Sequence, residues 1–209
     1  MDRRKFLKGT ATVVPATIGL QMLATRFAWA QTADFGSDED VLNYALTLEF
    51  LEAEFYRQGN EAGLLSGTEA EYVQTVGADE DAHVAALTDT IMKIGGTPVE
   101  APGVDFGQSF ASRESFLKTA HVFENTGVGA YLGAAGFIQN KDILQAAAGI
   151  FGVEARHAAI IGNLLNLSPE DGVYMGSTET ALSKDKVLSA VKPFLADSSS
   201  MSGGAAVTL

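Results

Sequence analysis

Two short motifs in the chain pair a carboxylate with an imidazole at the same spacing. Glu80-x-x-His83 and Glu154-x-x-His157 each place a glutamate three residues before a histidine. On a helix, residues three apart lie one turn apart on the same face, so each pair can grip one metal ion. A single pair arises readily by chance, but these two pairs use two of only three histidines. The repeated motif therefore indicates metal chemistry.

A glutamate and a tyrosine precede each motif at a matching distance. Glu49 is followed seven residues later by Tyr56, and Glu124 is followed seven residues later by Tyr131. Seven residues make about two helical turns, so each glutamate shares a helix face with its tyrosine. The first glutamate precedes its motif by 31 positions and the second by 30. The chain therefore reads as a duplicated hairpin.

The composition limits what the chain can bind. It has 209 residues and no cysteine, which excludes disulfides, thiolate metal sites and iron–sulfur clusters. A metal must then be held by histidine, aspartate and glutamate. With 46% hydrophobic residues the chain can form a core, and its length suits one domain. Its net charge of −12 repels phosphate backbones and anionic lipids, so we expect no nucleic-acid or membrane-surface partner.

Four long helices are expected to position these side chains, over residues 37–57, 68–94, 112–139 and 141–166. Ser37-x-x-Asp40 and Thr68-x-x-Glu71 are typical of capping boxes, and Ser112 is a typical N-cap residue. Between the second and third helices, residues 95–111 contain glycines and prolines and have no helical period.

The lengths of the connections predict the fold class. Short loops join the first helix to the second and the third to the fourth, so each pair should form an antiparallel hairpin. The connection between the hairpins reaches roughly 55 Å when extended, enough to run the length of a bundle. We therefore expect an all-α fold: a ferritin-like four-helix bundle of two antiparallel hairpins joined by a long crossover. A short C-terminal extension follows, with an amphipathic helix over 182–195.

The placement of the glutamates along the helices favours a pair of metal ions. Each of the four lies near the middle of its expected helix, and mid-helix positions of two antiparallel hairpins meet at one level. Four buried carboxylates without counterions would cost several kcal/mol each, whereas two divalent cations balance their charge. An oxygen-rich site with one imidazole per metal suits iron or manganese better than zinc.

This arrangement resembles the ferritin-like di-iron and di-manganese carboxylate proteins over residues 37–167. Within that superfamily the chain is most similar to the exported ferritin-like domain group related to plant desiccation proteins. The resemblance implies two metal ions, iron or manganese, as cofactors. It implies six metal ligands: Glu49, Glu80, His83, Glu124, Glu154 and His157. The bridging pair would be either Glu80 and Glu154 or Glu49 and Glu124.

The same resemblance implies a role for Asp79 at the cofactor site. In bacterioferritin-like sites an aspartate just before the Glu-x-x-His motif often orients a ligand histidine, so Asp79 is expected to hold His157. Val153 occupies the matching position in the fourth helix, which leaves His83 without an equivalent partner and argues against symmetric tuning of the two metals. No fifth helix of the cage-forming kind follows. A homo-oligomer is compatible with the sequence, but a ferritin cage is not expected.

The two tyrosines admit two interpretations, and so do the glycines of the third helix. Tyr56 and Tyr131 are candidate catalytic residues, as hydrogen-bond donors to the ligands or as redox-active groups, and equally core residues with satisfied hydroxyls. Gly127, Gly129, Gly133 and Gly136 each weaken a helix, so something must compensate. They either allow close backbone packing or leave space beside the metals for dioxygen or peroxide.

Two further residues could join the ligands. His121 lies three residues before Glu124 on the same face, although a plain, partly exposed histidine is the favoured interpretation because no equivalent precedes Glu49. Glu52 lies one turn from Glu49 and is also a candidate.

The first thirty residues predict export. Arg3 and Arg4 precede Phe-Leu-Lys, an apolar stretch covers residues 9–25, and Ala28-Trp29-Ala30 fits a cleavage site. This pattern resembles the twin-arginine signal, and the apolar stretch is short for a membrane span. We expect cleavage after Ala30, no stable membrane anchor afterwards, and a periplasmic or secreted protein. The expected organisation is a signal peptide over 1–30, the bundle over 31–167, and an extension with a flexible tail over 168–209.

These features favour an exported redox enzyme. Its dinuclear iron or manganese centre would oxidise ferrous iron or otherwise react with dioxygen or peroxide in stress protection. One alternative is peroxide disproportionation of the manganese-catalase kind. A second alternative is a non-catalytic metal-binding or desiccation-type stress protein.

Overall fold

The computed structural model describes residues 35–196, and this range is mainly helical. The expected signal peptide with its cleavage site, and the expected tail from residue 198, lie outside the described residues. The helices are α2 (Asp38–Glu61), α3 (Thr68–Lys93), α4 (Arg113–Ala134), α5 (Lys141–Leu164) and α6 (Lys184–Val191), with 3-10 turns η2 (Ala135–Phe137) and η3 (Lys192–Phe194). None of these helices is both long and apolar enough to cross a membrane.

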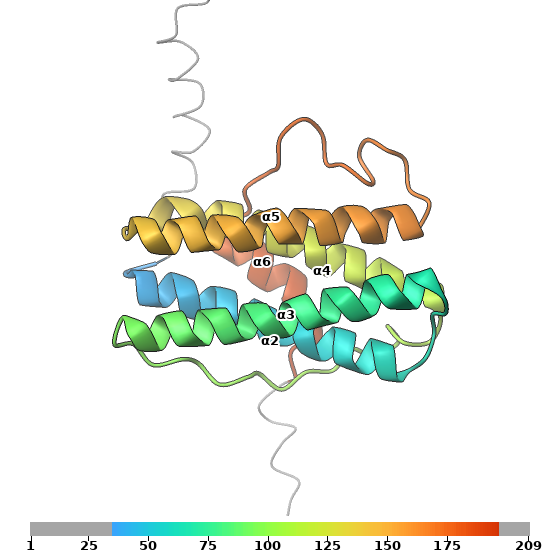
Figure 1. The fold of residues 1–209 in the computed structure, drawn as a ribbon, viewed down its shortest axis with the longest axis horizontal. Coiled ribbons are helices and arrows are strands. Elements are labelled where there is room, and N and C mark those ends of the chain that lie inside the picture. Colours follow the sequence, from blue (N-terminus) through green and yellow to red (C-terminus); the bar gives the residue numbers. More distant parts are fainter. Residues whose placement is uncertain (1–34, 197–209) are drawn as a thin grey trace, which may run out of the picture. The chain divides into compact units, whose positions relative to one another are not determined.

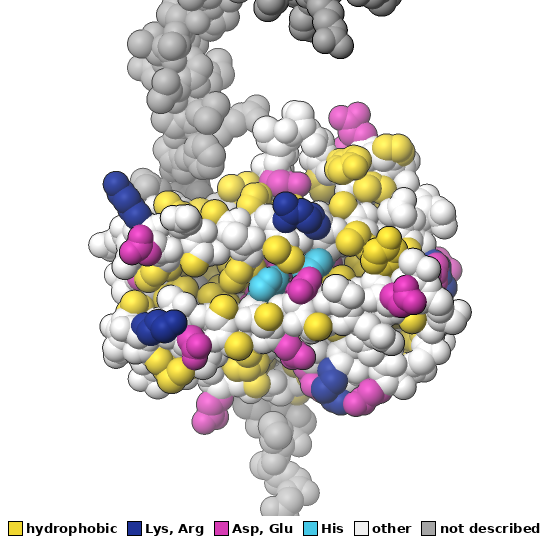
Figure 2. All heavy atoms as spheres, viewed as in Figure 1, with side chains coloured by type: hydrophobic (Ala, Val, Ile, Leu, Met, Phe, Trp, Pro, Cys, Tyr) yellow, Lys and Arg dark blue, Asp and Glu magenta, His cyan; other side chains and the backbone are white. Residues whose placement is uncertain are grey.

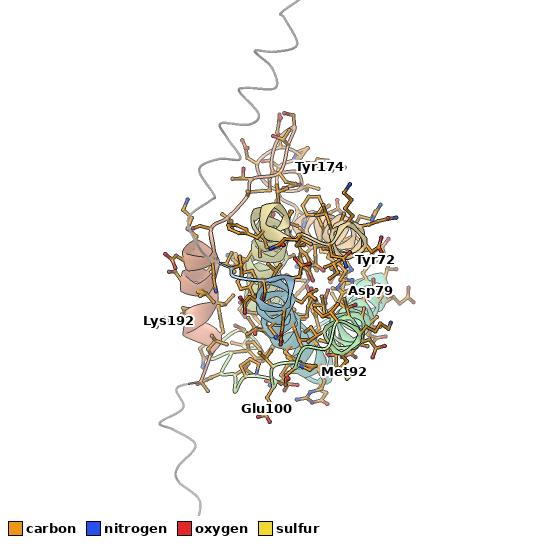
Figure 3. The ribbon with its side chains drawn as sticks, turned by 90° about the vertical axis from the view of Figure 1, so that its left-hand side faces the viewer. Tyr72, Asp79, Met92, Glu100, Tyr174 and Lys192 are labelled. Carbon is orange, nitrogen blue, oxygen red and sulfur yellow. The ribbon has the colours of Figure 1, made fainter. Side chains whose placement is uncertain are left out.

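The long helices form two antiparallel hairpins, α2 with α3 and α4 with α5 (Figure 1). The segment between the hairpins runs back along the bundle. The second hairpin therefore starts at the end of the bundle where the loop between α2 and α3 lies. Seen end-on, α3 and α5 form one layer, α2 and α4 a second, and α6 packs outside α4 (Figure 3). The predicted fold class is confirmed.

The helix starts follow local capping, with two corrections. Ser37 caps α2 by accepting a hydrogen bond from the backbone N–H of Asp40 at 3.1 Å. The reciprocal half of the predicted capping box is missing, because the Asp40 carboxylate accepts from the Gly36 N–H at 3.0 Å. Ser112 caps α4 in a reciprocal capping box, as expected of its N-cap role. The predicted capping box at Thr68 is wrong, because Thr68 is already helical and Gly67 precedes it with φ near +57° and no side-chain cap. A left-handed glycine makes this turn in place of a polar cap.

The third long helix is shorter than predicted. It ends at Ala134 and tightens into η2, where the sequence pattern had extended the helix to residue 139. The Asp38 carboxylate accepts hydrogen bonds from the backbone N–H groups of Gln139 and Asn140 at 2.7 and 2.9 Å. A residue from the start of α2 therefore fixes the turn between α4 and α5, and such a long-range contact cannot be read from local periodicity.

Side chains and backbone hold the crossover against the bundle. The Asn43 amide donates to the Thr97 carbonyl at 3.1 Å and accepts from the Val99 N–H at 2.8 Å. Further along, the Gly103 carbonyl accepts from the Ala196 N–H at 2.9 Å. The crossover is thus fastened to α2 and to the C-terminal segment.

Apolar clusters fill both ends of the bundle and leave its middle for the charged residues. At one end Phe55 packs against four aromatic rings at centroid distances of 5.0–5.3 Å. Those rings belong to Phe106, Phe110, Phe116 and Phe123. At the other end the buried residues include Leu42, Leu46, Leu87, Ile91 and Ile143. The middle level is therefore enclosed by hydrocarbon, which makes any charge placed there expensive.

Two of the glycines in α4 permit close packing of the C-terminal extension. The Leu182 N–H donates to the Gly129 carbonyl at 2.9 Å. A Cβ atom at Gly133 would lie 1.9 Å from the Leu182 carbonyl oxygen, and one at Gly129 would lie 2.5 Å from the Leu182 side chain. At these two positions the close-packing interpretation is the correct one.

Substitution of Gly133 tests this packing. We expect Gly133→Ala to destabilise the protein by about 1–3 kcal/mol, because backbone must move to admit the methyl group. Gly149→Ala in α5 is the matched control, since a Cβ there meets nothing within 4 Å and should stabilise the helix by up to about 1 kcal/mol. Urea unfolding of both variants gives the comparison. Equal stabilisation by the two substitutions would show that the extension does not pack against α4.

Candidate metal centre

The six predicted ligand residues converge from all four long helices. Glu49 comes from α2, Glu124 from α4, and the two Glu-x-x-His motifs from α3 and α5. The four glutamates have no exposed surface, and His83 and His157 are 8% and 3% exposed. Each helix presents these residues on its inner face because the apolar residues around them follow the helical period.

The six residues form two overlapping groups of four. The first contains Glu49, Glu80, His83 and Glu154, and the second contains Glu80, Glu124, Glu154 and His157. Within each group, one oxygen or nitrogen atom per residue lies within 4.8 Å of all the others. Both groups include Glu80 and Glu154, whereas Glu49 and Glu124 belong to one group each. Of the two pairs that the sequence left open as bridges, Glu80 and Glu154 are therefore the pair common to both groups.

His83 turns its Nδ1 atom toward three carboxylates. That atom lies 3.0 Å from Glu80, 3.1 Å from Glu154 and 3.3 Å from Glu49. Among the described residues, none hydrogen-bonds to its Nε2 atom, in keeping with the valine at position 153. The Nδ1 atom therefore lies where it could coordinate a metal ion together with these carboxylates.

His157, unlike His83, has contacts at both of its ring nitrogen atoms. Its Nδ1 atom lies 2.9 Å from Glu80 and 3.4 Å from Glu124, and its Nε2 atom lies 3.1 Å from an Asp79 oxygen. The contact expected between Asp79 and His157 is therefore present. Such a hydrogen bond fixes the tautomer of an imidazole and raises its basicity. Asp79 itself lies at the outer edge of α3 (Figure 3).

The two tyrosines connect the halves of the bundle. Tyr56 of α2 donates a hydrogen bond to Glu124 of α4, and Tyr131 of α4 donates one to Glu49 of α2 at 2.5 Å. Burial, together with the nearby glutamates, raises the pKa of both phenols well above the ordinary value. The hydroxyls therefore stay protonated and act as donors. Their catalytic role stays a prediction.

Five buried polar side-chain atoms make no hydrogen bond of normal geometry among the described residues. All five belong to this cluster, where four of them take part in ion-pair contacts of 2.9–3.4 Å. The five atoms are Glu80 Oε1, Glu124 Oε2, both Glu154 carboxylate oxygens and His157 Nδ1. Buried polar atoms are nearly always hydrogen-bonded, because leaving one unpaired costs about 1–3 kcal/mol. The donor set of oxygens and imidazole nitrogens, left unpaired at one point, fits a site for metal ions.

Without metal, protons must balance the charge. Burial alone would lower the pKa of His83, but its contacts with Glu154, Glu49 and Glu80 raise that pKa to about 12. His157 behaves alike, with burial outweighed by Glu124 and Glu80 and a pKa of about 11. Burial raises the pKa of Glu49 to about 7 and that of Glu154 well above its usual range.

Glu80 is the exception among the carboxylates. Burial favours its protonation, but close contacts with His157 and His83 outweigh burial and lower the pKa of Glu80 to about 2. The carboxylate that both histidines contact is therefore the one that stays ionised. The metal-free cluster therefore holds a negative charge on Glu80, flanked by two protonated imidazoles.

Glu52 has a fifth buried carboxyl group, and this group lies close to Gly127 of α4. It is 3% exposed, belongs to neither group of four, and has a pKa raised by burial and by the charge of Glu154. A Cβ at Gly127 would lie 3.0 Å from Glu154 Oε2 and 3.4 Å from Glu52 Oε1. Gly127 thus makes room for these carboxyl groups. Of the glycines in α4, only this one lies against the cluster.

His121 lies apart from the cluster. Its Nε2 atom is 2.9 Å from the Gly172 carbonyl oxygen, and it belongs to neither group of four. The geometry agrees with the interpretation of His121 as a plain, partly exposed histidine.

The cluster lies nearest to solvent between α3 and α5. Histidine side chains are visible there in the space-filling view, next to acidic side chains (Figure 2). The crossover and α6 lie on other sides of the bundle.

A bundle of two antiparallel hairpins with a long crossover, enclosing paired Glu-x-x-His motifs, defines the ferritin-like class of proteins. The family model of the ferritin-like domain matches residues 37–167. The chain therefore belongs to the ferritin-like domain family. Comparison with curated proteins gives no match.

The proton balance of the cluster predicts how stability depends on pH. When a chelator keeps the protein free of metal, the folded protein binds protons more tightly than the unfolded chain at Glu49, His83 and His157. Groups with a raised folded pKa stabilise the protein at low pH and lose that effect as pH rises. We therefore expect stability to fall as pH rises above about 4.5, through 7 and on toward the histidine values. Thermal unfolding between pH 5 and 9 measures this slope.

A substitution outside the cluster separates this effect from general charge repulsion. His121→Gln should leave the slope unchanged, whereas His83→Gln should reduce it between pH 7 and 9. Divalent metal should reverse the slope, because cations compete with the same protons. A metal-free protein whose stability rises steadily from pH 5 to 9 would contradict the proton balance described here.

Proposed function

We propose that the cluster binds two metal ions, iron or manganese. Six residues would be the ligands: Glu49, Glu80, His83, Glu124, Glu154 and His157. Glu80 and Glu154 would bridge the ions, because both belong to the two groups of four. The observation that carries this proposal is that every unpaired buried side-chain polar atom among the described residues lies at this one point.

The choice of metal follows from the ligand atoms. Four carboxylates and two imidazoles supply mostly hard oxygen donors, with one nitrogen for each ion. Structural zinc sites favour four ligands with more sulfur or nitrogen. Two divalent cations also match four ionised glutamates in charge, so they can replace the protons that the metal-free cluster retains.

The activity that this site supports best is oxidation of ferrous iron, with dioxygen or peroxide as the acceptor. A bound pair of ferrous ions supplies two electrons, and dioxygen that accepts them with two protons becomes hydrogen peroxide. Tyr56 and Tyr131 would hold Glu124 and Glu49 in place through their hydrogen bonds. Asp79 would orient His157, and the apolar ends of the bundle would keep bulk water away.

The cellular setting is part of the same proposal. The twin-arginine pattern and the likeness to the exported, desiccation-related group favour a periplasmic or secreted protein with a role in stress protection. We also propose that its small-molecule partner is dioxygen or peroxide. We propose that it has no nucleic-acid partner. Assembly into a homo-oligomer smaller than a ferritin cage is compatible with this role.

Anaerobic titration of the full chain with ferrous iron, followed by air, tests the activity. We expect about two ions per chain and a new absorbance band from the oxidised centre. Glu80→Gln should weaken both sites, since Glu80 is shared, whereas Glu49→Gln should weaken one. The matched control is Glu71→Gln, an exposed glutamate on the same helix as Glu80, and it should change nothing.

Each other outcome selects a different function. Rapid oxygen release from hydrogen peroxide by the manganese-loaded protein, without iron oxidation, would favour the manganese-catalase alternative. Metal that binds but supports neither reaction would leave a non-catalytic metal-binding protein. A natively exported protein that holds no metal and takes up none would contradict both enzyme functions.

The asymmetry between the two histidines gives a further prediction. Asp79→Asn should lower affinity for the ion beside His157 by about 10–100-fold, because the imidazole loses the carboxylate that orients it. The ion beside His83 should be affected less. Equilibrium dialysis against graded metal concentrations measures both affinities, and the exposed neighbour variant Asp81→Asn is the control. Equal weakening of both ions would contradict this role of Asp79.

A further inference from the structure

A cleft open to solvent lies where the end of the crossover, the start of α4 and the turn η3 meet. Its volume is about 410 Å³. Pockets that bind small molecules usually have volumes of about 300–1,000 Å³. The cleft is lined by residues 105–109, by Ser115 and Thr119 of α4, and by Pro193 and Phe194 of η3. It shares no lining residue with the candidate metal centre.

Backbone hydrogen bonds hold the walls of this cleft in place. The Asp105 N–H donates to the Phe194 carbonyl at 2.9 Å, which joins the crossover to η3. The Asp105 carboxylate accepts from the Gly107 N–H at 2.9 Å, and Gly107 has a left-handed backbone with φ near +51°. The Ser109 N–H donates to the Phe106 carbonyl at 2.9 Å. The cleft is therefore formed by the fold itself, before any ligand enters.

Most of the polar side chains in the lining are neutral. Ser109 is only 6% exposed, and its hydroxyl accepts a hydrogen bond from the Thr119 hydroxyl at 3.1 Å. The Thr119 hydroxyl also lies 3.1 Å from the Ser115 carbonyl oxygen, so this hydroxyl pair can offer a ligand either a proton or a lone pair. Gln108 is exposed, and its amide both donates and accepts. The Ser115 hydroxyl, in contrast, is engaged in the capping box of α4.

The apolar part of the lining is held rigidly. The half-buried Phe194 ring packs edge-on against Phe123, with 4.8 Å between the ring centroids. Phe106 lies 6.4 Å from the same ring, and the exposed Pro193 directly precedes it. Rings fixed in this way offer a flat apolar surface beside the hydrogen-bonding groups.

The charge of the lining limits the class of ligand. Asp105 is the only ionisable residue in it, and no lysine, arginine or histidine is present to pair with an anion. Lys192 precedes Pro193, but it does not line the cleft and lies on the outside of the bundle (Figure 3). An amine would pair with Asp105, but it carries only donors and would leave the donors of Gln108 and the hydroxyl pair unmatched.

We propose that this cleft binds a neutral carbohydrate of one or two sugar units. Each sugar hydroxyl both donates and accepts, as the Gln108 amide and the Ser109–Thr119 hydroxyl pair do, and the Asp105 carboxylate accepts from a further hydroxyl. The C–H face of the sugar ring packs on Phe194 and Pro193. Because the cleft and the metal centre have no residue in common, this binding needs no metal and does not depend on the proposed function.

Titration of the full chain with four neutral sugars tests the proposal. Glucose, galactose, maltose and sucrose are the probes, and calorimetry or ligand-observed NMR measures binding with and without metal. We expect saturable binding of at least one sugar, at one molecule per chain, in both forms. Gln108→Ala and Thr119→Val should each weaken it by about 2–10-fold, because each removes a hydrogen-bonding partner.

Each of these variants has a matched control outside the cleft. Gln145→Ala removes an exposed glutamine of α5. Thr75→Val removes a hydroxyl of α3 that, like that of Thr119, hydrogen-bonds to the carbonyl four residues earlier. Both controls should bind the sugar as the unchanged protein does. Gln108 is exposed, so Gln108→Ala is expected to fold, and thermal unfolding shows whether Thr119→Val does so too.

Choline and inorganic phosphate distinguish the other classes of ligand. Binding of choline in place of the sugars, weakened by Asp105→Asn, would identify an amine site and overturn the proposal. Binding of phosphate in place of the sugars would overturn it as well. The same holds if none of the four sugars shows saturable binding, or if the lining variants and their controls bind sugar equally well.

Discussion

The structure depends on how the negative charge of five carboxyl groups, buried at one level of the helical bundle, is balanced. These are Glu49, Glu52, Glu80, Glu124 and Glu154. Only two imidazoles lie among them, and apolar residues fill the bundle above and below. Like charges at such distances cannot all stay ionised in a dry interior, so either protons or metal ions must enter. The raised pKa values of His83 and His157 describe the proton form of this balance. The unpaired atoms mark where cations would replace those protons.

The two halves of the chain repeat each other, but not completely. Position 127 stands to Glu124 as position 52 stands to Glu49, and one half has a carboxyl where the other has a glycine. This difference is complementary, because a Cβ at Gly127 would press against Glu52 and Glu154. A second difference is that Asp79 directly precedes the Glu-x-x-His motif of α3, whereas Val153 directly precedes that of α5. Both departures fall at the cluster, so the two sides of the site differ in charge and in the orientation of their histidines.

The sequence was sufficient for the fold class and for the six converging residues, because both rest on regular patterns. Three histidines in the whole chain made two matched motifs informative, and the loop lengths left few ways to arrange four helices. Local capping was less reliable. The sequence predicts a capping box at Thr68, but Gly67 precedes the helix with a left-handed backbone. The turn after α4 depends on Asp38, about a hundred residues away.

Features that depend on which helix lies opposite could not be derived from the sequence. Glu49 and Glu80 look equivalent as candidate bridges until the distances show that both groups share Glu80. The burial of Glu52 likewise depends on a glycine in another helix. The packing of Leu182 on α4 could not be derived either, because an amphipathic pattern in the extension does not say which helix it packs against.

The tyrosines show why neither hairpin is complete alone. A spacing of seven residues places Tyr56 on the same face as Glu49, yet its hydroxyl bonds to Glu124 in the other hairpin, and Tyr131 bonds back to Glu49. The contacts of His83 and His157 cross between the hairpins in the same way. An isolated hairpin would lack these donors and its share of positive charge, and its inner carboxylates would face water. The interface between the hairpins therefore includes the residues of the candidate metal site beside the aromatic cluster around Phe55. Whatever enters that site contacts both halves of the bundle.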